Sequence, residues 1–145
     1  MRLECRYRAP AAHRVTAGLP EGHKCRRLHG HNYEITITVI GTMDPATGML
    51  MEFSEVDSRA RHVLDHVDHR DLNALGEGAT PIVETDLANK VRENPTAEHL
   101  ARWICAELRN FFAGVRKVGG MAPQIYSVRV EEEPGMAVEV GAGEV

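Results

Sequence analysis

Apolar and polar side chains alternate over several stretches of the chain, and this alternation predicts β-strands. From Asn32 to Val39 every second residue is apolar, β-branched residues are frequent, and the run ends at Gly41. Residues 126–130 alternate in the same way, and residues 136–140 follow a Glu-Pro-Gly turn as a final strand. The opening stretch, residues 2–13, is strand-like but more weakly patterned.

A spacing of three and four residues between apolar positions predicts two helices. The first begins behind Ser54, the expected N-cap, and its apolar stripe continues to Val67. The second begins near Thr96, and its stripe continues to Phe111. A short apolar strand, Met49–Phe53, is expected to precede the first helix and to return as the hairpin partner of the strand before it.

The segment Leu75–Pro95 loses both periodicities and contains Gly76 and Gly78, so we expect it to be irregular. A loop of that length in a small domain is more often functional than accidental. Strands before, between and after two helices, mostly joined by hairpins, predict an α+β fold with the helices on one face of an antiparallel sheet. The length of 145 residues suits one domain over residues 1–145.

Composition and charge narrow the classes of function. The net charge of −4 leaves no basic surplus for nucleic-acid phosphates or anionic lipid, so neither partner is expected. No apolar run approaches the ~20 residues of a membrane span, and the N-terminus lacks the apolar core of a secretory signal. Three cysteines without a CxxC pair argue against disulfides, and a cytoplasmic location is expected. Eight histidines are the unusual feature.

Three histidines have the spacing of a metal site. His29 and His31 lie two apart at the mouth of a strand, so both imidazoles point to the same side, and Gly30 keeps bulk out of the gap. His13 ends the first predicted strand, which an antiparallel pairing would bring beside them. Three histidines without a fourth protein ligand are typical of a catalytic zinc site, and imidazoles suit Zn²⁺ better than Mg²⁺ or Ca²⁺. The alternative is a set of surface histidines in loops.

Cys25 lies four residues before His29 among basic neighbours, and three interpretations remain open for it. In the first, the thiol is a fourth zinc ligand, which would make the site structural. In the second, it is a free acid/base group whose pKa is lowered by the surrounding positive charge. In the third, it is an inert residue in a loop.

Two Asp-His dipeptides are candidates for a proton-transfer pair, because a carboxylate beside an imidazole fixes its tautomer and raises its basicity. Asp65–His66 falls within the first predicted helix, whereas Asp68–His69 follows its last stripe residue, where the chain can bend into a cleft. Composition alone does not choose between them.

The run Glu131–Glu133 ends a strand, and a solvated charged edge explains at least two of its members. One carboxylate on the buried side is a candidate anchor for a guanidine-like ring edge, which it would accept through two parallel hydrogen bonds.

Taken in order, four segments resemble the motifs of the 6-pyruvoyl-tetrahydropterin synthase and 6-carboxytetrahydropterin synthase family. They are His23–His31 with Ala12–Arg14, then Asp68–Asn73, Asn94–Glu98 and Val128–Glu132. The resemblance covers nearly the whole chain. It implies a tunnelling fold, a four-stranded antiparallel sheet with two helices, assembled as two stacked trimers in a homohexamer with active sites between subunits.

The resemblance also implies roles for individual residues. Zn²⁺ would be held by His13, His29 and His31. Cys25 would be the catalytic base, with Asp68 and His69 as the paired proton relay. Glu132 would serve the reaction as the pterin anchor, and Thr96, in the third motif, would bind substrate.

The spacing between the cysteine and the histidine pair separates the subfamilies. Three residues lie between Cys25 and His29, which is the carboxy-type spacing and favours the queuosine-pathway 6-carboxy-5,6,7,8-tetrahydropterin synthase. The sequence His31-Asn32-Tyr33 is shared with pyruvoyl-type enzymes. The chain departs from the family pattern at three places: Glu52 for aspartate, Glu133 for threonine and Val140 for tyrosine.

The implied reaction converts 7,8-dihydroneopterin triphosphate to carboxytetrahydropterin, acetaldehyde and triphosphate. Lys24, Arg26 and Arg27 are candidates to meet the triphosphate, with a solvated basic run as the alternative. The competing functions are a 6-pyruvoyl-tetrahydropterin synthase, an enzyme that cleaves the dihydroneopterin side chain to feed folate synthesis, and a non-catalytic zinc or pterin-binding module.

Overall fold

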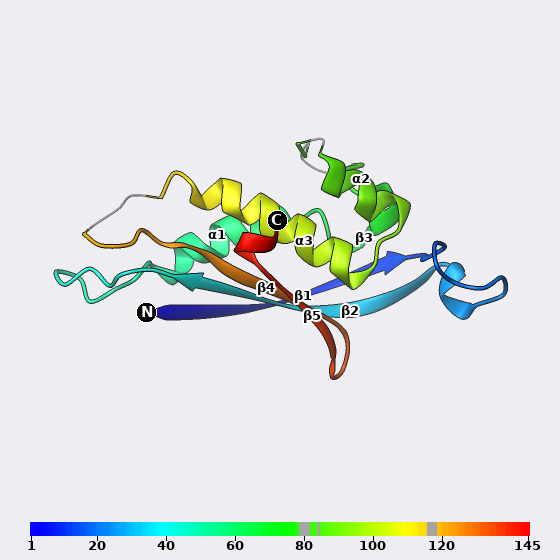
Figure 1. The fold of residues 1–145 in the computed structure, drawn as a ribbon, viewed down its shortest axis with the longest axis horizontal. Helices are drawn as coiled ribbons and strands as arrows, with labels where there is room; N and C mark the ends of the chain where they lie inside the picture. Colours follow the sequence, from blue (N-terminus) through cyan, green and yellow to red (C-terminus); the bar gives the residue numbers. More distant parts are fainter. Residues whose placement is uncertain (79–81, 84, 116–118) are drawn as a thin grey trace.

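A computed structural model describes residues 1–78, 82, 83, 85–115 and 119–145, and arranges them as a sheet with helices on one side (Figure 1). Four antiparallel strands make most of the sheet: β1 (Arg2–His13), β2 (His29–Ile40), β4 (Gln124–Glu133) and β5 (Met136–Gly141). A two-residue strand, β3 (Arg70–Asp71), adds parallel to β1, so the order is β3-β1-β2-β4-β5. The predicted α+β class is confirmed.

The centre of the sheet follows the alternation of the sequence. On β2, Tyr33, Ile35, Ile37 and Val39 are completely buried beneath the helices, whereas Asn32 and Glu34 are exposed on the opposite face. Burial of each such side chain contributes on the order of 2 kcal/mol, so a shift of register by one residue would turn the apolar set toward water.

Two amphipathic helices, α1 (Phe53–Leu64) and α3 (Ala97–Phe112), cover the sheet on the same face (Figure 1). The predicted start of α3 near Thr96 is confirmed, and Thr96 is its N-cap, because the Thr96 hydroxyl accepts the His99 N–H at 3.4 Å. Within the described residues, no helix has the length and apolar character needed to cross a bilayer.

A third helix, α2 (Asp86–Glu93), occupies part of the segment expected to be irregular, so that prediction is wrong there. The helix has eight residues and buries only Ala88 and Val91, too few positions for a visible periodicity. The sequence nevertheless marks the start of this helix, because Thr85 is an N-cap residue whose hydroxyl accepts the Ala88 N–H at 3.1 Å. Residues 79–81 and 84 of the same segment lie outside the described residues.

The expected strand Met49–Phe53 is also wrong. Leu50 and Met51 are buried against the core, but the partners of β2 are β1 and β4, and Phe53 already begins α1. The N-cap of α1 is Glu52 rather than Ser54, and its side chain makes no capping hydrogen bond. The described residues therefore form five strands and three α-helices, where the family resemblance implied four strands and two helices.

Candidate metal centre and active site

The register of β1 against β2 brings the three predicted histidines together. His13 lies directly opposite His29, and His31 lies opposite Ala11 on the same face. The ring centroids are 4.5 Å apart for His13 and His29, 5.2 Å for His13 and His31, and 5.0 Å for His29 and His31. One ligand nitrogen from each ring lies within 4.8 Å of the others, and in the described part of the chain no other group of His, Cys, Asp or Glu meets this condition. The three histidines could hold a metal ion.

Gly30 allows the two strands to approach at this point. A Cβ atom at Gly30 would lie 3.1 Å from the carbonyl oxygen of Ala11 on the neighbouring strand. A larger residue between the two histidines would therefore require the β1 backbone beside it to shift by a few tenths of an ångström.

Backbone carbonyls set the tautomers of two of the histidines. The Nδ1 atom of His13 lies 2.7 Å from the Pro95 carbonyl oxygen, and that of His29 lies 2.8 Å from the Arg27 carbonyl oxygen. A carbonyl only accepts, so each Nδ1 carries the proton and each Nε2 keeps a free lone pair. Burial lowers the pKa of His13, which is 1% exposed, and so favours the neutral ring that a metal requires.

Glu132 faces the ligand nitrogens of this cluster. Its Oε1 atom lies 3.3 Å from Nε2 of His13 and 3.6 Å from Nε2 of His31. The buried Tyr33 hydroxyl donates to the same oxygen at 3.3 Å, and burial together with this carboxylate raises the pKa of Tyr33. Tyr33 therefore remains a donor at neutral pH and fixes the Glu132 carboxylate, a role that the sequence did not reveal.

The neighbouring glutamates are engaged elsewhere. Glu131 accepts the Gly135 N–H at 3.0 Å and pairs with Arg129, and these two interactions lower its pKa. Glu133 is largely exposed, and its Oε1 atom lies 3.9 Å from Nδ1 of His31. Of the three carboxylates, the Glu132 side chain is the one beside the Nε2 atoms.

A cavity of about 450 Å³ opens onto the cluster. Its walls include most of the residues that the sequence singled out: Cys25, His13, His29, His31, Thr96 and Glu132. The cavity is thus lined by three histidines that could hold a metal, a thiol and the carboxylates of Glu98, Glu132 and Glu133, the groups needed for metal-assisted proton transfer.

Cys25 is held in this cavity by a short turn. It lies in a 3-10 turn, Lys24–Arg26, and its N–H donates to Nδ1 of His23 at 3.2 Å. Its carbonyl accepts the Val15 N–H at 2.8 Å, which joins the turn to the end of β1. His23, to which the sequence assigned no role, lines the same cavity, and its two-residue spacing to Cys25 is the signal that was available.

Asp68 and His69 contact each other but do not line this cavity. Nδ1 of His69 lies 2.8 Å from Oδ1 of Asp68, and the His69 side chain is 79% exposed. His69 adopts a left-handed backbone conformation, with φ of 58°, and its N–H donates to the Pro10 carbonyl. The alternative dipeptide is excluded as an accessible pair, because His66 is buried against Trp103.

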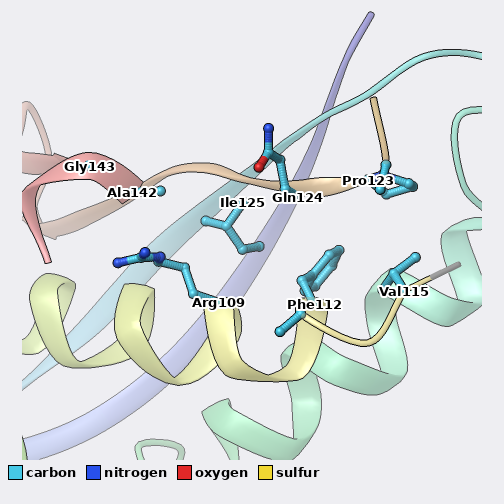
Figure 2. A pocket seen from close by; sticks show the side chains of 10 residues that line it. Arg109, Phe112, Val115, Pro123, Gln124, Ile125, Ala142 and Gly143 are labelled. Carbon is cyan, nitrogen blue, oxygen red and sulfur yellow. The ribbon is translucent and has the colours of Figure 1, made fainter. Parts of the chain in front are cut away.

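A different cavity, of about 420 Å³, lies between the C-terminal end of α3 and the start of β4 (Figure 2). Arg109, Phe112 and Ile125 are among its lining residues, which include no histidine, cysteine or carboxylate. Arg109 donates to the carbonyl of Val145 and so fastens the C-terminal segment. This cavity lacks acid/base and metal-ligating groups, so the histidine cavity is the candidate site.

Nearly the whole chain matches a known protein family. Residues 2–142 match the sequence profile of the family described as 6-pyruvoyl tetrahydropterin synthase. The chain belongs to this family. A 6-carboxy-5,6,7,8-tetrahydropterin synthase from Synechocystis is 35% identical over 115 residues, which cover 75% of this chain and 70% of that protein. A dihydroneopterin monophosphate aldolase from Pyrococcus furiosus is 28% identical over 116 residues, covering 79% and 82% respectively.

The family fold is also seen by structural comparison. The structure of Caenorhabditis elegans 6-pyruvoyl tetrahydropterin synthase matches with a TM-score of 0.74 and 24% identity, covering 97% of this chain and 94% of that one. The tunnelling fold implied by the sequence motifs is therefore confirmed.

Proposed function

We propose that this protein is a zinc-dependent 6-carboxy-5,6,7,8-tetrahydropterin synthase of queuosine biosynthesis, acting in the cytoplasm. It would convert 7,8-dihydroneopterin triphosphate and water to 6-carboxytetrahydropterin, acetaldehyde and triphosphate. The observation that carries the proposal is the single cavity in which three histidine nitrogens, Cys25 and Glu132 meet. The carboxy-type spacing from Cys25 to His29 and the Synechocystis relative support the choice within the family.

The donor set fits Zn²⁺. The described cluster offers three imidazoles, and two have Nε2 left free by a carbonyl that holds Nδ1–H. His13, His29 and His31 would hold the ion, which when bound supplies Lewis acidity toward the hydroxyls of the substrate side chain. Three protein ligands leave a coordination position open for those hydroxyls.

The residues around the cluster would bind the pterin and transfer protons. Glu132 would accept two hydrogen bonds from the pterin ring edge, with Tyr33 holding the carboxylate in place. Cys25 as thiolate would take a proton from the side-chain carbon, and Thr96 would bind substrate at the cavity wall. His69, oriented by Asp68, would carry protons on the opposite side of the substrate.

A second copy of the chain would bring the relay to the site. In one chain the Asp68–His69 pair is exposed and lines a different part of the surface from Cys25. We therefore include in the proposal a homohexamer of two trimers, in which each site joins the cavity of one subunit to the relay of another.

A second function is favoured by one observation. The Pyrococcus furiosus aldolase matches over a larger share of both chains than the Synechocystis synthase does. An aldolase acting on a dihydroneopterin would use the same cavity but release a side-chain aldehyde and keep a hydroxymethylpterin.

Product analysis separates these functions. We expect the zinc-loaded protein, incubated with 7,8-dihydroneopterin triphosphate, to yield 6-carboxytetrahydropterin and acetaldehyde by mass spectrometry. A 6-pyruvoyl product would assign the pyruvoyl reaction, and a 6-hydroxymethyl product from dihydroneopterin or its phosphates would assign the aldolase. Binding of the pterin without formation of any product would show that the protein is a non-catalytic binding module.

A further inference from the structure

We propose that Lys24 and Arg27 form a subsite for the polyphosphate chain of the substrate. This inference rests on the proposed function for the identity of the ligand, a phosphorylated pterin. Of the three basic residues Lys24, Arg26 and Arg27, it assigns the first and the last to phosphate binding and Arg26 to stabilising the loop.

The two residues line a cavity that joins the histidine cluster. This cavity, of about 400 Å³, has Lys24, Arg27, Leu28 and Glu133 among its lining residues. It shares Cys25, His29, His31 and Glu133 with the larger cavity that holds Glu132. A ligand bound at the cluster can therefore extend a charged chain past Cys25 into the basic end.

The Arg26 side chain forms hydrogen bonds within the loop rather than facing the basic cavity. Its guanidinium donates to the carbonyl oxygen of Thr16 at 2.6 Å and to that of Leu19 at 3.0 Å. These bonds tie the segment after β1 to the turn that carries Cys25. Arg26 is half-buried and does not line the basic cavity.

Lys24 and Arg27 are exposed and have no carboxylate partner among the described residues. They flank one turn of 3-10 helix, closed by the Arg27 N–H donating to the Lys24 carbonyl at 3.1 Å. In such a turn side chains three residues apart project on the same side. Two unpaired cations therefore project together beside the cluster.

The pair has the chemistry of a polyphosphate site. An arginine fork binds two phosphate oxygens at once, and a lysine adds a mobile point charge for a neighbouring phosphate. Glu133, which lines both cavities, carries the one negative charge among the described residues that line the basic cavity. The pterin ring would bind at Glu132 and the phosphates at Lys24 and Arg27.

The experiment compares two ligands on a protein that does not turn over. In zinc-loaded Cys25→Ala protein, the Kd values of 7,8-dihydroneopterin triphosphate and of 7,8-dihydroneopterin are measured by pterin fluorescence. The Kd of dihydroneopterin divided by the Kd of the triphosphate is the ratio that isolates the contribution of the phosphates, because both ligands use the cluster and Glu132 equally. We expect Lys24→Ala and Arg27→Ala each to reduce the ratio roughly tenfold while leaving the Kd of dihydroneopterin unchanged.

Arg102→Ala is the matched control, because it removes one exposed charge from α3 that does not line this cavity. An unchanged ratio in the Lys24→Ala/Arg27→Ala double variant, or an equal reduction in Arg102→Ala, would overturn the proposal. If neither pterin binds, the proposed function fails, and inorganic tripolyphosphate replaces the pterins as the probe. Its binding should then weaken in the double variant and not in the control, and equal binding in all three would overturn the subsite as well.

Discussion

The histidine cluster and the Asp68–His69 pair show two ways in which one chain places titratable groups. The cluster is built where β1 ends and β2 begins, with His13 1% exposed and backbone carbonyls holding two of its rings. The pair lies where the chain leaves α1, with the His69 side chain 79% exposed on a left-handed backbone. The first is complete in one chain, whereas the second points to solvent.

Backbone geometry explains this difference. Strand register fixes His13 opposite His29 without any side-chain interaction, so the cluster forms whenever β1 pairs with β2. The relay depends instead on one residue held at positive φ, a conformation that costs on the order of 1 kcal/mol for a side chain other than glycine. Strain of this kind persists where the surroundings impose it, and here the Pro10 carbonyl accepts the His69 N–H.

The largest expected effect is loss of the metal. His31→Ala should remove one of three ligands and reduce bound zinc from about one ion per chain to nearly none, since two imidazoles do not make a stable site. Metal analysis after gel filtration measures this. His69→Ala is the control and should retain zinc; a metal-replete His31→Ala protein would refute the assignment of the cluster.

Cys25→Ala should abolish turnover and keep the zinc. Removal of a positioned acid/base group lowers the rate by roughly 10²–10⁴-fold. Turnover of dihydroneopterin triphosphate and metal content are measured on the same preparation. Loss of zinc in Cys25→Ala would instead make the thiol a fourth ligand and the site structural.

Mixing two inactive variants tests whether the relay acts across subunits. Cys25→Ala and His69→Ala chains, unfolded together and reassembled, should recover roughly a quarter of the wild-type activity per site if each site takes Cys25 from one chain and His69 from another. Each variant reassembled alone is the control. If the mixture assembles normally by light scattering but recovers no activity, Cys25 and His69 of each site come from the same chain.

The sequence was informative where structure is local. Alternation predicted β2 and β4, the Glu-Pro-Gly turn predicted β5, and a weaker strand-like pattern predicted β1. The two-residue spacing of His29 and His31 predicted their shared face. The expectation that His13 would join them needed only antiparallel pairing, which the structure confirms.

The errors have physical causes. α2 was missed because eight residues with two buried positions give no measurable period. Met49–Phe53 was misassigned because a short apolar run suits a strand, a buried loop and a helix start equally well. Tyr33 was missed because its contact with Glu132 joins residues far apart in the sequence, whereas the contact of His23 with the Cys25 N–H is local and its two-residue spacing was overlooked.

Acidification should destabilise the metal-free protein. Burial holds the pKa of His13 below its ordinary 6.5, so below that pH the unfolded chain binds a proton that the folded chain does not. The free energy of unfolding therefore falls as the pH is lowered through about 6.5 and levels off below the folded pKa. Urea titrations of chelator-treated protein between pH 7.5 and 5, on the order of half a unit apart, measure the slope.

Substitution assigns this slope to particular side chains. His13→Gln should reduce it but leave part, because burial and the nearby His62 also lower the pKa of His66. The His13→Gln/His66→Gln double variant should have the smallest slope. An unchanged slope in both variants would show that other groups control the acid response.

The smallest expected effect separates capping from substrate binding at Thr96. Thr96 caps α3 and lines the histidine cavity, whereas Thr85 caps α2 and does not line it. Each Thr→Ala change removes one capping hydrogen bond, so each should lower the free energy of unfolding by about 1 kcal/mol. Only Thr96→Ala should also raise the KM for the pterin substrate, by a few-fold, because only this hydroxyl lies at the cavity wall. Equal KM values in the two variants would show that Thr96 only caps α3. Substrate binding in the cavity would then be assigned to the histidines, Cys25 and Glu132.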